Sequence, residues 1–483
     1  MRKEAALPTQ SDQGLHFWYQ KSTLLILLAS LFVVVQALSC VIPPFQSPDE
    51  SFHLGRAYLL SKGRIFLGNN GQVSGGNVDI GLSDYIDVFR DQRWFPYDED
   101  KRRTRDPRAS LAKEITWTGT EKFFRAPNVA NYFPLPYAPQ AAAIAIGEST
   151  GMTVANSYRL ARTFSLLATL GILGIALLTY PVPPFVCALF VMPMTLFQMS
   201  SVSLDPVSFS LCVLTGALFM RGTNLNVSFT RTMHFVLAIC LFSLATCRLN
   251  LVPFTLLLAV LYRIRRSFTY LVSWTAVSVL SFSWIICVFE TIKEGGTLQV
   301  RSDLLTNYMS HPTEFFHVLS ATLGNTDVLK GVWYMFIGAM GWSEITMSGG
   351  HFDRLQGIFL DPGIYFCFGI LLALMALLSV KFGVSRSFGL SNASLLIGAT
   401  LSALCIFLAL LVMWTPPPAK VIIGVQGRYF IPSAIFVGFA LFNNKVSPTK
   451  ARLAVGLLFI MAATSIMAMG PRLLEQYWVT PPL

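Results

Sequence analysis

Long apolar runs, separated by short polar breaks, constrain the fold of this chain more than any other feature. About 20 apolar residues span the hydrocarbon core of a bilayer as one helix. Of the 483 residues 53% are hydrophobic and only 13% are charged, about half the charged share of soluble domains. The pattern predicts an all-α polytopic membrane protein with about eleven transmembrane helices. The predicted spans are 22–42, 160–179, 183–199, 206–220, 233–247, 249–262, 269–289, 359–380, 392–414, 429–443 and 452–470.

The first run, residues 22–42, predicts a retained transmembrane helix because it is long enough to span and no small-residue cleavage site follows it. Residues 233–262 are either one long helix or two short ones. One helix would place the charge of Arg248 at mid-membrane, so a tight hairpin with Arg248 at its tip is favoured. The eight cysteines all lie in or beside apolar runs, which predicts no disulfide framework.

The basic residues predict the orientation. With a cytosolic N-terminus, 13 Lys and Arg residues but only Glu4 and Asp12 face the cytosol. The other 23 basic and 23 acidic residues balance outside, so the whole formal charge of +11 lies on the cytosolic side. This is the positive-inside pattern, and it argues against nucleic acid as a partner.

Two long polar segments lie on the outer side in this topology. The first holds 13 acidic and 13 basic residues, and its mixed-charge run at 98–108 predicts a solvated face or a contact with a charged acceptor. The alternative topology makes 135–146 a span, but crowded prolines favour a juxtamembrane helix there. The same is predicted for 331–346. The predicted order is a cytosolic tail (1–21), the first helix (22–42), a large periplasmic loop (43–158), helices two to seven (159–289), a second periplasmic segment (290–358), helices eight to eleven (359–470) and a periplasmic tail (471–483).

The stretch PPFQSPDESFHLGR, residues 43–56, follows directly on the first predicted span. Its Ser47-Pro48 pair is typical of a helix start, with Ser47 as N-cap and Pro48 at the first helical position. Glu50 lies three residues after Ser47 and would close a capping box. Its carboxylate would then turn back to the Ser47 backbone, away from a substrate.

Asp49, His53 and Arg56 share one face of this predicted helix, at about 100° per residue. An acid, an imidazole and a guanidinium would therefore meet at the membrane surface. Catalysis by Asp49 and simple stabilisation of the helix dipole are both compatible with this stretch taken alone.

Further polar residues lie at the predicted outer mouths of later spans. Arginine binds phosphate with two parallel hydrogen bonds, but for any single arginine taken alone, snorkelling toward head groups is the favoured interpretation. Recurrence at one depth, beside a carboxylate-bearing helix, favours a substrate site for the group. Asp205 is either an N-cap-like residue before a proline or a second carboxylate of the site. The residues concerned are Arg159, Arg162, Asp205, Arg248, Arg428 and Tyr429.

Several chemistries have no motif in this sequence. It contains no P-loop and no G-x-G-x-x-G dinucleotide motif. His53 follows Asp-Glu, but D-E-x-x-H is not the zinc-binding H-E-x-x-H, and no cysteine or histidine cluster joins it. The sequence therefore predicts neither a metal nor a cofactor.

The motifs PPFQSPDESFHLGRAYLLSKG, NYFPLPYAP, SVSLDP and VQGRYFIP, in this order, resemble a bacterial family of multispanning membrane proteins that is similar to the GT-C glycosyltransferases. The resemblance covers about residues 40–440. It implies a lipid-phosphate-linked sugar as donor, an inner-membrane location and a periplasmic active site. By motif, Asp49 matches the acidic base after the first helix, and Arg159 or Arg162 matches an arginine near the donor phosphate.

The length and layout are also similar to those of phage-type, serotype-converting glucosyltransferases. That similarity implies glucose, carried on undecaprenyl phosphate, and lipopolysaccharide O-antigen or another periplasmic glycan as acceptor. A flippase or transporter of lipid-linked glycans is the alternative, and it would bury charges in its spans and carry internal repeats. A glycan polymerase is chemically closer and stays open.

Overall fold

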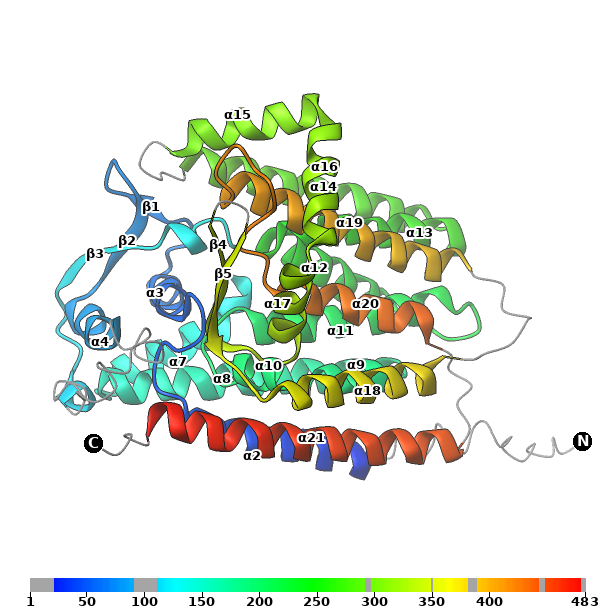
Figure 1. Cartoon of the computed structure of the whole chain (residues 1–483), viewed down its shortest axis with the longest axis horizontal. Coiled ribbons are helices and arrows are strands. Elements are labelled where there is room, and N and C mark those ends of the chain that lie inside the picture. Colours follow the sequence, from blue (N-terminus) through cyan, green and yellow to red (C-terminus); the bar gives the residue numbers. More distant parts are fainter. Residues whose placement is uncertain are drawn as a thin grey trace, which may run out of the picture.

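The computed structural model describes residues 21–90, 111–291, 297–348, 351–380, 389–442 and 448–478. This part of the chain is mostly helical, with long helices running side by side and the β-strands near one end of the bundle (Figure 1). The predicted mixed-charge run at 98–108 lies outside the described residues.

Nine apolar helices in the described ranges coincide with nine predicted spans. Six are long and apolar enough to cross a membrane: α8 (Val154–Thr179), α11 (Asp205–Thr223), α14 (Phe268–Thr291), α18 (Pro362–Ser379), α19 (Leu390–Met413) and α21 (Pro448–Tyr477). Three are shorter: α2 (Lys21–Val41), α12 (Arg231–Cys247), and α20 (Ile431–Leu441) with the 3-10 turn η6 (Gly427–Phe430) before it.

The other two predicted spans are not continuous α-helices, and the prediction is wrong there. Residues 183–199 form α9 (Pro184–Leu189) and α10 (Pro193–Met199). Met192 between them is extended, at φ −69° and ψ 146°, because a following proline disfavours helical backbone. Residues 249–262 form the 3-10 helix η5 (Leu249–Thr255) and then α13 (Leu256–Arg265).

The predicted hairpin around Arg248 is present. Arg248 ends α12 in an extended conformation, and α13 then returns toward the far end of α11. There the Arg265 guanidinium donates to the carbonyl groups of Gly222 (2.6 Å) and Asn224 (3.1 Å). The reversal keeps the Arg248 charge at an end of the bundle.

A small α/β unit follows α2. It contains α3 (Glu50–Ser61), α4 (Ile80–Arg90), and a three-stranded antiparallel sheet of β1 (Gly68–Asn69), β2 (Ser74–Asp79) and β3 (Glu121–Arg125). The all-α prediction is wrong here. Gly75 permits the close pairing of β2 with β3, since a Cβ there would lie 2.0 Å from the Phe124 carbonyl oxygen.

The predicted helix at 135–146 is present as the 3-10 turn η4 (Leu135–Tyr137) and α7 (Ala138–Ser149), which packs on α3 and α8. Two further 3-10 turns, η2 (Ala112–Glu114) and η3 (Pro127–Val129), complete the unit. Its apolar core, around Tyr58, Tyr85 and Tyr158, is separate from the core of the helix bundle.

The second polar segment contains α15 (Thr297–Ser310), α16 (Pro312–Gly324), α17 (Thr326–Ile337) and the hairpin β4 (Met340–Ser348)–β5 (His351–Ile358). The predicted helix at 331–346 is therefore wrong over its second half. Gly338 ends α17, and Gly341 at φ +77° adopts left-handed backbone that continues no helix.

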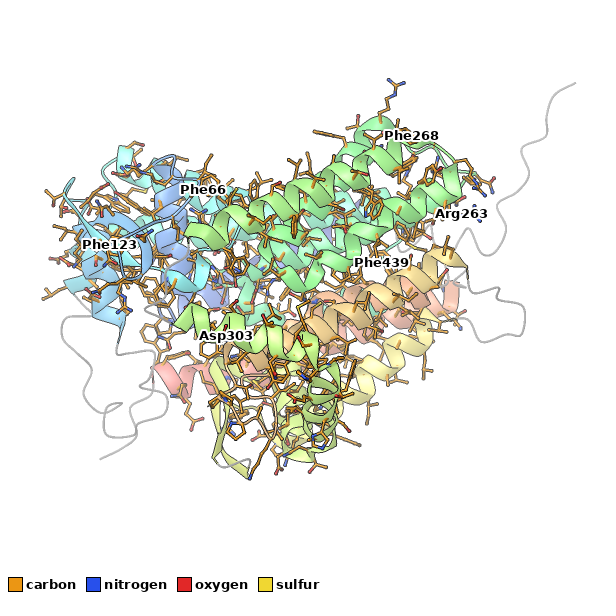
Figure 2. All side chains as sticks on the ribbon, turned by 90° about the horizontal axis from the view of Figure 1, so that it is seen from above. Phe66, Phe123, Arg263, Phe268, Asp303 and Phe439 are labelled. Atoms are coloured by element: carbon orange, nitrogen blue, oxygen red, sulfur yellow. The ribbon has the colours of Figure 1, made fainter. Side chains whose placement is uncertain are left out.

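The carboxyl ends of α2 and α21 meet, because Trp478 Nε1 donates to the Val41 carbonyl oxygen (2.7 Å). We call this end of the bundle the loop end. Lys21 lies at the other end of α2, about 30 Å away at 1.5 Å per residue. Figure 2 likewise shows Phe66 and Phe123 at the loop end and Arg263 at the opposite end.

The predicted topology makes the loop end periplasmic. We expect a cysteine at the exposed Gln72 to react with a membrane-impermeant thiol reagent added to intact cells. A cysteine at Ser267, beside Arg265 and Arg266, should react only after the membrane is opened. The native chain, with eight cysteines, gives the background. Labelling at Ser267 but not at Gln72 in intact cells would reverse the orientation.

Candidate active site

Helix α3 begins at Glu50, two residues later than predicted, with Asp49 as its N-cap. Only half of the predicted capping box forms. The Ser47 backbone N–H donates to Glu50 Oε2 (3.3 Å), but the Ser47 hydroxyl donates to Gln198 Oε1 on α10 (2.7 Å). The Ser47 hydroxyl, which was predicted to cap the helix, is therefore bonded to the side chain of Gln198 instead.

Glu50 is fully buried and joins three parts of the fold. Its Oε1 accepts hydrogen bonds from the Tyr158 hydroxyl (2.7 Å) and the Val202 backbone N–H (3.1 Å). The same oxygen pairs with Arg162 at 3.4 Å. Through these contacts with α8 and with the turn before α11, the Glu50 carboxylate anchors the start of α3.

Arg162 is equally committed to the fold and is only 4% exposed. Its guanidinium donates to the carbonyl oxygens of Ser39 (3.1 Å), Ile42 (2.9 Å) and Pro43 (3.0 Å). The last carbonyl groups of a helix have no partner within the helix. Arg162 supplies partners at the end of α2 and fixes the direction in which the chain leaves it.

Arg56 is fully buried and also binds backbone. It donates to the carbonyl oxygens of Arg64 (3.0 Å), Ile65 (2.5 Å) and Tyr132 (3.4 Å). These contacts tie the end of α3 to the chain that follows it and to the segment before η4. The geometry favours a structural role for Arg56.

Asp49 differs from these residues. Its backbone is left-handed, at φ 59° and ψ 9°, and its side chain makes no capping hydrogen bond. Asp at an N-cap ordinarily bonds a backbone N–H of the first turn. Here the half-buried carboxylate accepts instead from Asn128 Nδ2 on η3 (2.9 Å). Left-handed backbone at a residue other than glycine costs about 1–3 kcal/mol and clusters at functional sites.

Asp205, Arg248 and Arg428 come together from distant parts of the chain. Asp205 is the first residue of α11 and is 5% exposed. Its Oδ1 pairs with Arg248 at the tip of the hairpin, and its Oδ2 lies 3.4 Å from Arg428 Nη1. We call Arg248 and Arg428 the arginine pair. One carboxylate thus faces two guanidinium groups, which leaves a net positive charge.

The arginine pair is held from both sides. Gly427 brings η6 against α17, since a Cβ there would lie 2.1 Å from the Val332 carbonyl oxygen. Arg428 Nε then donates to Gln426 Oε1 (2.8 Å), and its guanidinium lies 5.2 Å from the centre of the Tyr429 ring. Arg248 Nε is buried without a partner among the described residues, so one buried donor is left for another acceptor.

Tyr132 lies within range of the charges of Asp49 and of the arginine pair. The Phe133 backbone N–H donates to the Thr246 carbonyl oxygen (3.4 Å), which fixes this segment beside the end of α12. Burial raises the pKa of Tyr132 to about 12, while the charges of Arg248 and Arg428 oppose that rise and Asp49 adds to it. The pKa of Tyr132 therefore depends on the charges of Asp49, Arg248 and Arg428.

His53 lines the same site. Its ring lies parallel to that of Tyr132, and its Nδ1 is 2.7 Å from the Tyr137 hydroxyl. Burial, and then the charges of Arg248 and Arg428, lower the pKa of His53 to about 3. The imidazole is therefore neutral near pH 7 and can offer a hydrogen bond, but it is a poor proton acceptor.

Six of the ten predicted residues therefore form one cluster at the loop end. Three others, Glu50, Arg56 and Arg162, stabilise the fold around this cluster. Arg159 lies exposed on α8, outside the cluster. The sequence did not predict Asn128 as a site residue, because it lies in no recognisable motif. It did not predict Tyr132 either, although Tyr132 belongs to the NYFPLPYAP motif. No group of three or more His, Cys, Asp or Glu side chains suited to a metal occurs among the described residues. The clustered residues are Asp49, His53, Asp205, Arg248, Arg428 and Tyr429.

A family model described as "Predicted membrane protein (DUF2142)" matches residues 31–437. The chain belongs to this family. The match contains all four motifs quoted above, so the resemblance to a multispanning membrane family is confirmed for this DUF2142 protein. Comparison with curated proteins and with solved structures finds no match.

Proposed function

We propose that this DUF2142 protein is a GT-C-type glycosyltransferase of the bacterial inner membrane. It moves a sugar, with glucose as the best candidate, from undecaprenyl phosphate to a periplasmic glycan such as lipopolysaccharide O-antigen. One observation carries the proposal: Asp49 is held in left-handed backbone, withdrawn from helix capping, and lies four residues before His53, on which the charges of the arginine pair act.

Asp49 is the general base in this mechanism. It takes the proton of an acceptor hydroxyl while that oxygen attacks the anomeric carbon of the donor. The bond between the anomeric carbon and the phosphate oxygen breaks, and undecaprenyl phosphate leaves with the electron pair. Glu50 is unsuited to this task, because its carboxylate is fully buried and accepts hydrogen bonds from Tyr158 and Val202.

The arginine pair stabilises the departing phosphate. Guanidinium groups match phosphate oxygens bidentately and are suited to charge that develops in a transition state. Asp205 neutralises one of the two positive charges and holds both arginines in place. The Nε of Arg248, which has no partner in the part of the chain that the structure describes, can donate to the incoming phosphate.

The direct test supplies purified protein with radiolabelled undecaprenyl-phosphate glucose, with and without O-antigen acceptor. Transfer of label to the acceptor supports the proposal. In sealed vesicles, movement of intact donor between leaflets without cleavage would identify a flippase instead. Extension of a lipid-linked glycan would identify a polymerase.

Replacement of Arg248 or Arg428 with Lys should weaken donor binding. Lysine keeps the charge and an ion pair with Asp205, but it loses the two parallel hydrogen bonds to phosphate. We expect at least one variant to lower donor affinity about tenfold, or ~1.4 kcal/mol, in a binding assay with the labelled donor. Arg159→Lys is the matched control, because Arg159 lies outside the cluster. Wild-type affinity in both arginine-pair variants would assign them to structure alone.

A further inference from the structure

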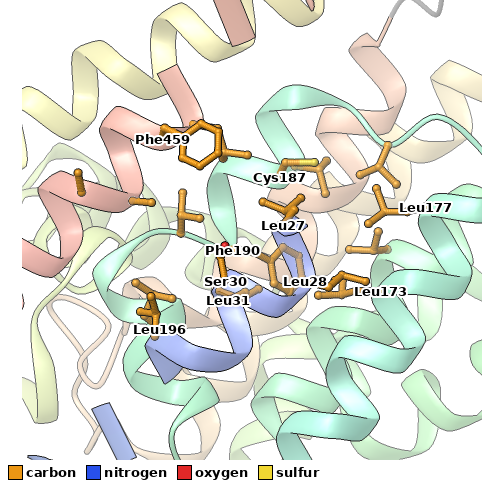
Figure 3. A pocket seen from close by; sticks show the side chains of 18 of the residues that line it. Leu27, Leu28, Ser30, Leu31, Leu173, Leu177, Cys187, Phe190, Leu196 and Phe459 are labelled. Atoms are coloured by element: carbon orange, nitrogen blue, oxygen red, sulfur yellow. The ribbon is translucent and has the colours of Figure 1, made fainter. Parts of the chain in front are cut away.

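An apolar cavity of about 300 Å³ lies within the helix bundle and shares no residue with the Asp49 cluster. Figure 3 shows its walls, which come mainly from α2, α8, α9 and α21. Every side chain that lines it is uncharged, and Ser30 carries the only hydroxyl group among them. A single hydroxyl cannot supply the two to four polar partners that a buried water needs, and apolar cavities stay dry and accept apolar molecules.

The depth of the cavity restricts its occupant. On α2 it is lined between Leu27 and Val34, which lie about 9–20 Å along the helix from Lys21 at 1.5 Å per residue. The hydrocarbon core of a bilayer is about 30 Å thick. The cavity therefore lies near the middle of the membrane, where lipid chains are present but head groups are not.

One side of the cavity faces the surrounding lipid. Ser30 on α2 and Ala463 on α21 both line the cavity and are exposed, and these two helices, which contact each other, carry only small side chains at these positions. Phe459, on the same side, is 57% exposed. The opposite wall includes Leu196 and Val213, each 1% exposed. The cavity thus leads from the lipid-facing surface into the core.

We propose that this cavity binds one acyl chain of a bilayer phospholipid, which enters between α2 and α21. The uncharged lining gives no means of selecting a lipid by its phosphate, so the site takes the most abundant hydrocarbon chain at this depth. The occupant braces α2, whose carboxyl end leads into α3 and the Asp49 cluster. This inference is independent of the proposed function, because it requires no sugar transfer.

Photo-crosslinking tests the proposal directly. The full chain is reconstituted in vesicles of phosphatidylethanolamine with a smaller share of phosphatidylglycerol, part of it carrying a diazirine near the end of an acyl chain. After irradiation, we expect labelled peptides that include Leu196 or Val213, since these buried residues are reached only by a chain inside the cavity. Labelling confined to exposed positions would overturn the proposal.

Two tryptophan substitutions on α21, one that lines the opening of the cavity and one that does not, test the route of entry. Ala463→Trp should fill this opening and remove the labelling of Leu196 and Val213. Ile460→Trp, one turn away on the same helix, is 53% exposed and does not line the cavity, so it should leave that labelling unchanged. Equal labelling of Leu196 and Val213 in both variants would refute entry between α2 and α21. Undecaprenyl phosphate that carries a diazirine is the competing probe. If it labels Leu196 and Val213 more strongly than the phospholipid does, the acyl-chain assignment is wrong.

Discussion

Asp49→Asn is expected to abolish sugar transfer while the protein folds and still binds donor. Asparagine keeps the size of the side chain and tolerates left-handed backbone better than most residues, so the contact with Asn128 can persist. It removes the basicity that general base catalysis needs, which is worth about 10²–10⁴ in rate. Turnover of labelled undecaprenyl-phosphate glucose should fall by at least that factor, with unchanged donor affinity and melting temperature.

Glu50→Gln is the neighbouring control, and its expected effect is of a different kind. Glutamine with its oxygen at the Oε1 position can still accept from Tyr158 and Val202, but its amide N–H₂ would then face the donor N–H of Ser47. We expect a lower melting temperature with substantial transfer per folded molecule. An active Asp49→Asn enzyme beside an inactive but fully folded Glu50→Gln enzyme would exchange the assigned roles of the two carboxylates.

The apolar runs predicted most of the helices because transmembrane helices are decided largely by local composition. The breaks depend on particular residues within those runs. Pro193 divides 183–199 into α9 and α10, which hydropathy alone cannot detect. The sequence did not predict the sheet of β1–β3, because β1 has only two residues, β3 lies far from β2 in sequence, and the pairing of β2 with β3 rests on the close approach that Gly75 permits.

For the site, helical spacing predicted Asp49 and His53 on one face of a helix, but Asp49 lies before α3 in left-handed backbone, which that spacing does not describe. Spacing could not separate the arginines that bind backbone from those that face an open site. Arg162 and Arg248 look alike in sequence, each at a helix mouth. Only the folded chain shows that Arg162 donates to three carbonyl groups at the end of α2, whereas Arg248 pairs with the carboxylate of Asp205.

Arg162→Met should destabilise the protein strongly, by about 3–5 kcal/mol, because it leaves a buried carboxylate without its ion-pair partner. It also removes the donors to the Ser39, Ile42 and Pro43 carbonyl groups. The measurement is thermal unfolding in detergent. Arg159→Met, one turn earlier on the same helix and exposed, is the matched control and should leave the melting temperature nearly unchanged.

The double variant Arg162→Met with Glu50→Gln separates charge from capping. If the unpaired charge of Glu50 dominates the loss, neutralising Glu50 in the Arg162→Met background should recover part of the stability, although the same change alone is destabilising. If the lost caps on α2 dominate, the two losses should simply add. Simple additivity, or a stable Arg162→Met protein, would contradict a Glu50–Arg162 ion pair as the anchor of α3, and with it the rigid support that the mechanism requires beneath Asp49.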